Sequence, residues 1–166
     1  MTLTVPCLFG LESLVADEMR RLDLKNVRAE NGRVHCEGTL ADIARLNINL
    51  RCGARVLMEL GSFPARDFEA LFQGVYALPW EDYIPRDGEF PVKGYSLNSQ
   101  LHSVPACQSI VKKASAKRLG EKYGVETLPE SGSRYQIQFS IIKDVATLYL
   151  DTSGEGLYLS LIHISE

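Results

Sequence analysis

A lysine-rich stretch between Ser103 and Gly124 carries the only concentrated positive charge in the sequence. From residue 105 to residue 123 it holds four lysines and one arginine against a single glutamate, whereas the whole chain of 166 residues has a formal net charge of -3. A local cationic surface of this kind is typical of a contact for nucleic-acid phosphates. Most lysine-rich helix faces are simply solvated, however, so the rest of the chain must decide between the two interpretations.

The same stretch has the pattern of an amphipathic helix with defined ends. Ser103 offers a capping oxygen, Pro105 suits a first turn that does not need its missing N–H, and Gly124 can take the left-handed conformation that ends a helix. At 100° per residue, the apolar face collects Cys107, Ile110, Val111 and Ala114. Lys113 and Lys117 fall along another face. The sequence therefore predicts a helix that packs on one side and carries charge on the other.

The segment Asp-Thr-Ser-Gly-Glu-Gly-Leu at residues 151–157 is the second candidate for chemistry. As a dinucleotide-binding loop it lacks the third glycine of G-x-G-x-x-G, because Ser160 stands nearest that place. As an aspartic-protease site it is interrupted by Ser153 and has no second copy. We favour a strand end followed by a turn, in which Asp151 and Thr152 satisfy turn N–H groups.

No other recurrent catalytic pattern occurs in the sequence. There is no Ser-His-Asp spacing, no G-x-x-x-x-G-K-[ST] phosphate loop and no H-E-x-x-H helix. The four cysteines form no C-x-x-C pair and are interpreted as buried thiols, and the three histidines stand at no ligand spacing from them. The sequence therefore nominates no nucleophile, cofactor or metal ion in this chain.

The composition, 45% hydrophobic and 23% charged residues, is that of a folded protein with one ordinary domain or two small ones. No apolar run reaches the roughly 18 residues that cross a membrane, and the first residues lack the layout of a signal peptide. We therefore expect a cytoplasmic protein.

Residues 1–65 predict the element order βαββαβ. Strands are expected at 3–8 and 54–63, and an Asn31-Gly32 turn joins two more strands at 27–30 and 33–37. Thr39 can cap the second helix, and the first helix, opened by Gly10, has an apolar side made of Leu11, Leu14, Val15, Met19 and Leu22. This order predicts a ferredoxin-like unit, an antiparallel sheet with both helices on one face.

The second half of the chain predicts another α/β unit. A helical stripe runs from Phe68 to Val75, a strand is expected at 89–96, and two alternating strands at 135–141 and 145–151 flank Lys143-Asp144. Trp80 and Tyr83 could stack on bases, but a tryptophan in a helix-ending segment is more often part of a core, which is the interpretation we favour.

Several of these segments carry a family resemblance, in the right order along residues 1–157. They are Leu-Pro-Trp-Glu-Asp-Tyr-Ile-Pro at 78–85, Glu-Phe-Pro-Val at 89–92, Ser-Val-Pro-Ala-Cys-Gln-Ser-Ile-Val-Lys-Lys-Ala at 103–114, Lys-Asp at 143–144, Asp-Thr-Ser-Gly at 151–154 and Gly-Leu at 156–157. Together they resemble the front end of bacterial THUMP-domain RNA methyltransferases, the group close to the large-subunit ribosomal RNA guanine-N2 methyltransferase.

The resemblance implies a ferredoxin-like domain at residues 1–65 and an RNA-binding THUMP domain at residues 66–157. It also implies a methyltransferase domain in the same full-length protein, with an S-adenosylmethionine loop and an Asn/Asp-Pro-Pro-Tyr/Phe motif, neither of which this sequence contains. We therefore expect a chain without cofactor or catalytic activity that binds RNA, and the resemblance implies that this RNA is ribosomal RNA. The residues nominated as RNA contacts are Lys93, Lys112, Lys113, Lys117 and Arg118.

Two departures from the family pattern stand out. Tyr95 follows Gly94 where a basic residue is expected, and residues 158–166 form a tail that is foreign to the pattern and is interpreted as non-native. Three other functions stay open at this point: a protein-interaction module that uses the ferredoxin-like sheet, the THUMP module of a tRNA-modifying enzyme, and a small enzyme whose site the sequence does not reveal.

Overall fold

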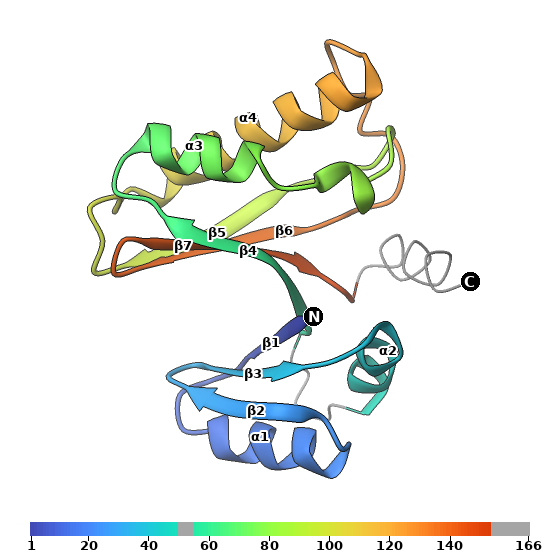
Figure 1. Cartoon of the computed structure of the whole chain (residues 1–166), viewed down its shortest axis with the longest axis vertical. Helices are drawn as coiled ribbons and strands as arrows, with labels where there is room; N and C mark the ends of the chain where they lie inside the picture. Colours follow the sequence, from blue (N-terminus) through green and yellow to red (C-terminus); the bar gives the residue numbers. More distant parts are fainter. Residues whose placement is uncertain (50–54, 154–166) are drawn as a thin grey trace.

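The computed structural model describes residues 1–49 and 55–153, which form one twisted seven-stranded sheet with four α-helices (Figure 1). In chain order the elements are β1 Thr2–Pro6, α1 Glu12–Arg21, β2 Lys25–Glu30, β3 Arg33–Glu37, α2 Leu40–Asn49, β4 Leu57–Pro64, α3 Phe68–Tyr76, the 3-10 helix η1 Trp80–Asp82, β5 Val92–Leu97, α4 Val104–Tyr123, β6 Ile137–Ile142 and β7 Val145–Asp151. The strand order is β2-β3-β1-β4-β7-β6-β5. The predicted fold class, a ferredoxin-like unit followed by a second α/β unit, is confirmed.

The first four strands have the predicted split βαβ arrangement. β1 pairs antiparallel with both β3 and β4, and β2 pairs antiparallel with β3. Gly32, at a φ of 80°, closes the predicted hairpin between β2 and β3. Thr39 caps α2 as predicted, since the Asp42 N–H donates to Thr39 Oγ1 (3.3 Å) and the Thr39 N–H donates to Asp42 Oδ2 (2.8 Å).

Strand β4 belongs to both halves of the sheet. Leu57 and Met58 pair with β1 along one edge and with β7 along the other. A register shift between Glu59 and Gly61 marks a bulge in this strand, and the expected domain boundary at residue 65 falls directly after it. The two halves are therefore joined by hydrogen-bonded backbone.

In the second half, α3 and α4 lie side by side on one face of the sheet (Figure 1). β6 pairs antiparallel with β7 and parallel with β5. The β6–β7 hairpin turns at Lys143 and Asp144, both at positive φ (50° and 64°), as the two-residue turn predicted there requires.

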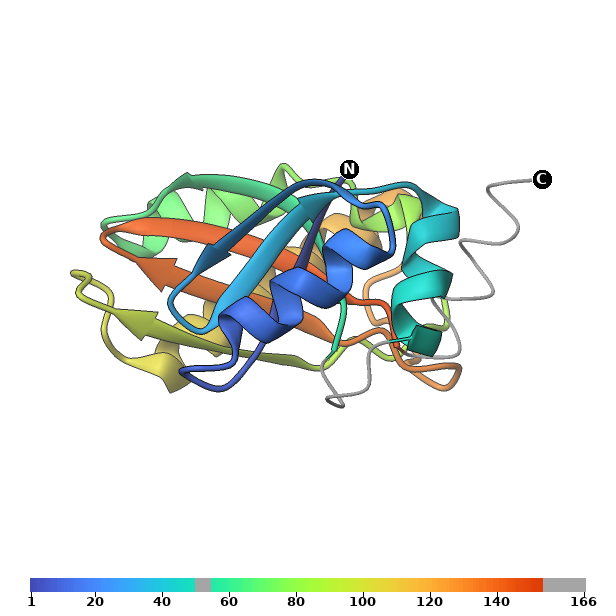
Figure 2. The same ribbon diagram turned by 90° about the horizontal axis from the view of Figure 1, so that it is seen from below.

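The helix-free faces of the two halves look toward each other. In Figure 1, α3 and α4 lie above the sheet of the second half and α1 lies below the strands of the first half. Figure 2 shows, from the first-half side, that the strands of the first half lie across those of the second. Arg33 Nη1 donates to Tyr149 Oη at 3.4 Å across the gap, beside a cleft of about 90 Å³ lined in part by Thr4 and Tyr95.

The core contains the residues that the alternation and helical patterns selected, with a few exceptions. Trp80 is fully buried and its Nε1–H donates to Val75 O at 2.8 Å, so the core interpretation of this residue is confirmed. Leu11 and Leu14 were expected to pack but are 36% and 50% exposed. The reason is that α1 packs on β2 and β3 through the side of the helix that bears Val15, Ala16 and Met19.

Candidate nucleic-acid interface

Helix α4 begins and ends where the sequence predicts. Ser103 Oγ accepts the Ala106 N–H (3.4 Å), and Gly124 takes the left-handed conformation (φ 69°) after the last turn. The buried stripe of α4 comprises Cys107, Val111, Ala114, Ser115, Leu119 and Gly120. Ile110 was expected to be a full member of this stripe but is only half-buried, because the stripe turns toward Ser115 and Leu119.

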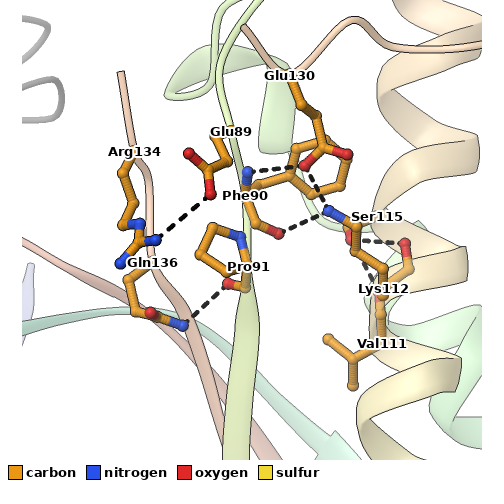
Figure 3. Close-up of polar contacts among 9 residues, drawn as sticks. All are labelled: Glu89, Phe90, Pro91, Val111, Lys112, Ser115, Glu130, Arg134 and Gln136. Atoms are coloured by element: carbon orange, nitrogen blue, oxygen red, sulfur yellow. Dashed lines mark hydrogen bonds and ion pairs between the residues drawn. The ribbon is translucent and has the colours of Figure 1, made fainter. Parts of the chain in front are cut away.

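Lys112, predicted to contact RNA, forms an internal clamp (Figure 3). Its Nζ donates to Glu130 Oε1 at 2.7 Å and to the Phe90 carbonyl at 3.0 Å, and lies 3.4 Å from the centroid of the Phe90 ring. Glu130 Oε1 also accepts the Phe90 N–H at 3.2 Å. Partial burial would raise the pKa of Glu130, but the hydrogen bonds from Lys112 and Phe90 outweigh it and lower that pKa. The clamp fastens Phe90, two residues before β5, to α4.

Arg118, another predicted contact, is also neutralised inside the protein. Its Nε and Nη2 donate to the two carboxylate oxygens of Glu81 at 3.0 and 2.7 Å, and both side chains are about one-fifth exposed. The hydrogen bonds from Arg118 lower the pKa of Glu81 and correspondingly raise the pKa of Arg118. This bidentate pair joins α4 to η1 and leaves little free charge for a ligand.

Lys113 and Lys117 are exposed on α4 and form no ion pair with any residue that the structure describes. Lys117 Nζ lies 5.8 Å from the Phe72 ring centroid and 5.4 Å from that of Tyr76, both on α3. Those two rings are stacked, with centroids 6.5 Å apart and planes inclined by 13°. The exposed charge of Lys117 therefore lies beside an aromatic pair.

The Tyr76 hydroxyl donates a short hydrogen bond to Glu121, one turn beyond Lys117. This bond to a carboxylate raises the pKa of Tyr76, so the phenol stays neutral at physiological pH. Glu121 thereby holds the Tyr76 ring in place beside α4.

Lys93, the fifth predicted contact, lies on the far side of the sheet from α4. Side chains alternate along β5, and Gly94 packs on Phe139 while Ser96 Oγ donates to the Leu101 carbonyl, so these two face α4. Lys93 and Tyr95 therefore point to the helix-free face, where Tyr95 lines the cleft between the halves. The structure thus brings Lys113 and Lys117 together and separates Lys93 from them.

The Asp-Thr-Ser segment forms the turn that local chemistry favours. Asp151 Oδ1 accepts from the N–H (2.9 Å) and the hydroxyl (2.6 Å) of Ser153, while its Oδ2 accepts from Arg55 Nη1 at 2.7 Å. Thr152 differs from the expectation, since its hydroxyl donates to the Val56 carbonyl at 2.7 Å instead of accepting a turn N–H. Both side chains are buried and serve the fold. Residues 154–166, including the tail judged foreign, lie outside the described part.

Within residues 1–49 and 55–153, no group of three or more His, Cys, Asp or Glu side chains could hold a metal ion. No helix in the same ranges is long and apolar enough to cross a membrane. Cys36 and Cys107 are buried as expected, whereas Cys7 is half-buried and Cys52 lies outside the described residues.

Family models match almost the whole described chain in two consecutive pieces. The RlmL ferredoxin-like domain matches residues 2–57, and the THUMP domain matches residues 65–151. The first match runs from β1 to Leu57, the first residue of β4, and the second runs from just after β4 to the end of β7. The chain therefore belongs to the THUMP domain family, with a ferredoxin-like domain of the RlmL type before it.

Two relatives are named as RNA methyltransferases. The chain is 40% identical over 159 residues to YpsC of Bacillus subtilis (strain 168), described as a candidate RNA methyltransferase. It is 30% identical over 157 residues to the ribosomal RNA large subunit methyltransferase K/L of Pseudomonas aeruginosa. These matches cover 95% and 94% of this chain but only 41% and 22% of the relatives, so the chain spans less than half of either.

Two solved structures are also similar to this chain in sequence and fold. A protein from Listeria monocytogenes, described as a predicted N6-adenine-specific DNA methylase, is 46% identical with a TM-score of 0.84. SMU.472, described as a candidate methyltransferase in complex with SAH, is 42% identical with the same TM-score. Each match covers 90% of this chain and 40% or 41% of the other.

The aromatic residues beside Lys117 are not indicated by the sequence patterns described above. The helical stripe predicted from Phe68 to Val75 includes Phe68 and Phe72 as packed residues and leaves out Tyr76. In the structure Leu71 and Val75 fill the buried stripe, Phe68 is 43% exposed, and Phe72 and Tyr76 are half-buried. The spacing of Phe68, Phe72 and Tyr76, four residues apart, was the signal that could have identified them as a separate row.

Proposed function

We propose that this chain is the RNA-docking portion of an S-adenosylmethionine-dependent ribosomal RNA guanine-N2 methyltransferase. Residues 1–65 and 66–157 act as its ferredoxin-like and THUMP domains, and a methyltransferase domain in the same full-length protein carries out catalysis. The support is the family membership together with relatives named as RNA methyltransferases.

The observation that carries the proposal is the uneven pairing of charge on α4. Lys112 and Arg118 are bound to Glu130 and Glu81, whereas Lys113 and Lys117 stay exposed and unpaired by acidic side chains of the described residues. Two cations one helical turn apart can each contact a phosphate of the same strand, which fixes position without reading sequence. Lys93 offers a separate contact on the opposite face of the sheet.

The cofactor is assigned to the methyltransferase domain. A carboxylate at the end of a strand, as Asp151 is, could in principle hold a ribose hydroxyl. Here both oxygens of Asp151 are already used, by Ser153 and Arg55. Asp151 is also only 3% exposed, so this carboxylate does not offer a contact for the ribose of S-adenosylmethionine.

Binding of labelled RNA at several salt concentrations tests the proposal. A ribosomal RNA fragment should bind more weakly as salt rises, because phosphate contacts release counterions. A transfer RNA and a duplex DNA of equal length distinguish the tRNA-modifying and DNA-modifying alternatives. Binding of none of them, or binding that salt does not weaken, would reject the proposal in favour of a protein-interaction module.

The double variant Lys113→Gln/Lys117→Gln localises the contact. If each lysine neutralises one phosphate of looped RNA, the slope of log affinity against log salt should become shallower by about 1.4. The matched control is Arg20→Gln/Arg21→Gln on α1, where Arg20 is already 3.5 Å from Asp17. Equal losses in both double variants would mean that the attraction is diffuse.

The isolated chain should transfer no methyl group. Incubation with RNA and labelled S-adenosylmethionine is expected to leave the RNA unlabelled above background. Label in the RNA would show that the chain has a catalytic site and would contradict the division of labour proposed above.

A further inference from the structure

We propose that Phe72 and Tyr76 of α3, with Lys113 and Lys117 of α4, form a binding site for unpaired nucleotides. In this site the aromatic rings stack on bases and the lysines contact the phosphates of the same strand. The inference rests on the proposed function, because it names the class of RNA that the α4 surface takes.

The aromatic pair has the geometry of a stacking platform. The Phe72 and Tyr76 planes are inclined by only 13°, and their centroids, 6.5 Å apart, are at the long end of the range for aromatic pairs. Neither ring belongs to the fully buried core, and each is only half-buried. Ring surface therefore remains for a third flat group, and every base has a π-face that can use it.

The cationic row runs parallel to the aromatic row. Lys117 Nζ is within 6 Å of both ring centroids, while Tyr76 hydrogen bonds to Glu121, one turn further along α4. One turn earlier on each helix stand Lys113 and Phe68, both exposed. Each step along both rows is four residues, or about 6 Å of helix rise, so successive phosphates and bases can follow the two rows together.

The placement of lysines beside aromatic rings favours binding of unpaired RNA over duplex RNA. In a duplex the bases are stacked on one another and only the phosphates and sugar edges are exposed, so the duplex could use the lysines but not the rings. An unpaired segment can use both. The hydrogen bond from Tyr76 to Glu121 holds one ring in place before binding, which reduces the ordering cost.

The test uses an unpaired oligoribonucleotide that carries 2-aminopurine and the same sequence annealed to its complement. The wild-type chain should bind the unpaired form more tightly and quench its fluorescence, because 2-aminopurine loses emission when it stacks. Loss of a stacked base costs about 1–3 kcal/mol, or roughly 5- to 150-fold in affinity. Since these rings are half-buried, we expect Phe72→Leu to weaken binding of the unpaired oligoribonucleotide about fivefold and Phe72→Leu/Tyr76→Leu about 25-fold. Binding of the duplex should be unchanged.

Two controls separate stacking from folding and from charge. Tyr95→Leu removes an aromatic ring that is 43% exposed on the other side of the sheet and should not change either affinity. Tyr76→Phe keeps the ring and loses only the hydroxyl, so it should retain most of the binding and the quenching. If the double leucine variant does not fold, Phe72→Leu alone, with an unchanged thermal melt, decides the question.

The outcomes distinguish this inference from the proposed function. One outcome is that the lysine variants weaken RNA binding while the leucine variants still prefer unpaired to duplex RNA and still quench 2-aminopurine. That result would refute the stacking site and leave the proposed RNA-docking function supported. If wild type binds duplex and unpaired RNA equally, the inference is also refuted. If it binds no RNA at all, both proposals fail.

Discussion

Lys112 and Lys113 are adjacent in the sequence, yet their substitution should have opposite consequences. Lys112→Met keeps the length of the side chain but removes the charge that bonds to Glu130 and to the Phe90 carbonyl. We expect the free energy of unfolding to fall by about 1–2 kcal/mol, and RNA affinity to change little. Lys113→Met should change stability by no more than about 0.5 kcal/mol and should weaken RNA binding.

The magnitude follows from the contacts of Lys112. The side chains of the Lys112–Glu130 ion pair are 35% and 32% exposed, so solvent screens the attraction between them. Such a pair contributes about 0.2–1 kcal/mol to the free energy of unfolding. The cation above the Phe90 ring, 3.4 Å from its centroid, adds about 0.5–1 kcal/mol. Glu130 keeps the Phe90 N–H as a partner after the substitution, so no buried carboxylate is left unpaired.

Urea unfolding of wild type, Lys112→Met and Lys113→Met, followed by circular dichroism, measures these differences. Because contacts with Lys112 lower the pKa of folded Glu130, the stabilisation is fully present above the unfolded value of about 4.3. It is lost as the pH falls through the lower folded pKa. The gap between wild type and Lys112→Met should therefore narrow below about pH 4. A constant gap, or a stable Lys112→Met variant that no longer binds RNA, would refute the clamp.

Three further predictions concern the scaffold. Gly94→Ala would place a Cβ 2.3 Å from the Phe139 carbonyl oxygen of the neighbouring strand, so we expect a loss of about 1–3 kcal/mol or more in urea unfolding. Trp80→Phe leaves the Val75 carbonyl without its indole partner and should lower the free energy of unfolding by about 2–4 kcal/mol. Circular dichroism measures this loss, because Trp80 is the only tryptophan and the variant has no tryptophan fluorescence. Burial raises the pKa of Cys36 to about 11, so iodoacetamide at pH 8 should modify this thiol only after unfolding, as mass spectrometry of peptides can show.

The order of the elements was predictable because its signals are local. Helix α4 has its ends encoded by Ser103 and Gly124, and the two hairpins are encoded by Asn31-Gly32 and Lys143-Asp144. Turn and cap chemistry acts over a few residues and does not depend on what the rest of the chain does. The burial of Trp80 was also predictable from a local signal, because a tryptophan in a segment that ends a helix is more often part of the core.

The composition of the candidate interface was decided by tertiary structure. The sequence groups five basic residues as equivalent predicted contacts, but in the structure Lys112 and Arg118 are paired with Glu130 and Glu81, 18 and 37 residues away. The alternation of β5 places Lys93 on the opposite face. Conversely, Phe72 and Tyr76 join Lys117 only because α3 packs beside α4. Sequence periodicity states which side of an element a residue occupies, whereas the charge and the ring that face it depend on contacts between distant segments.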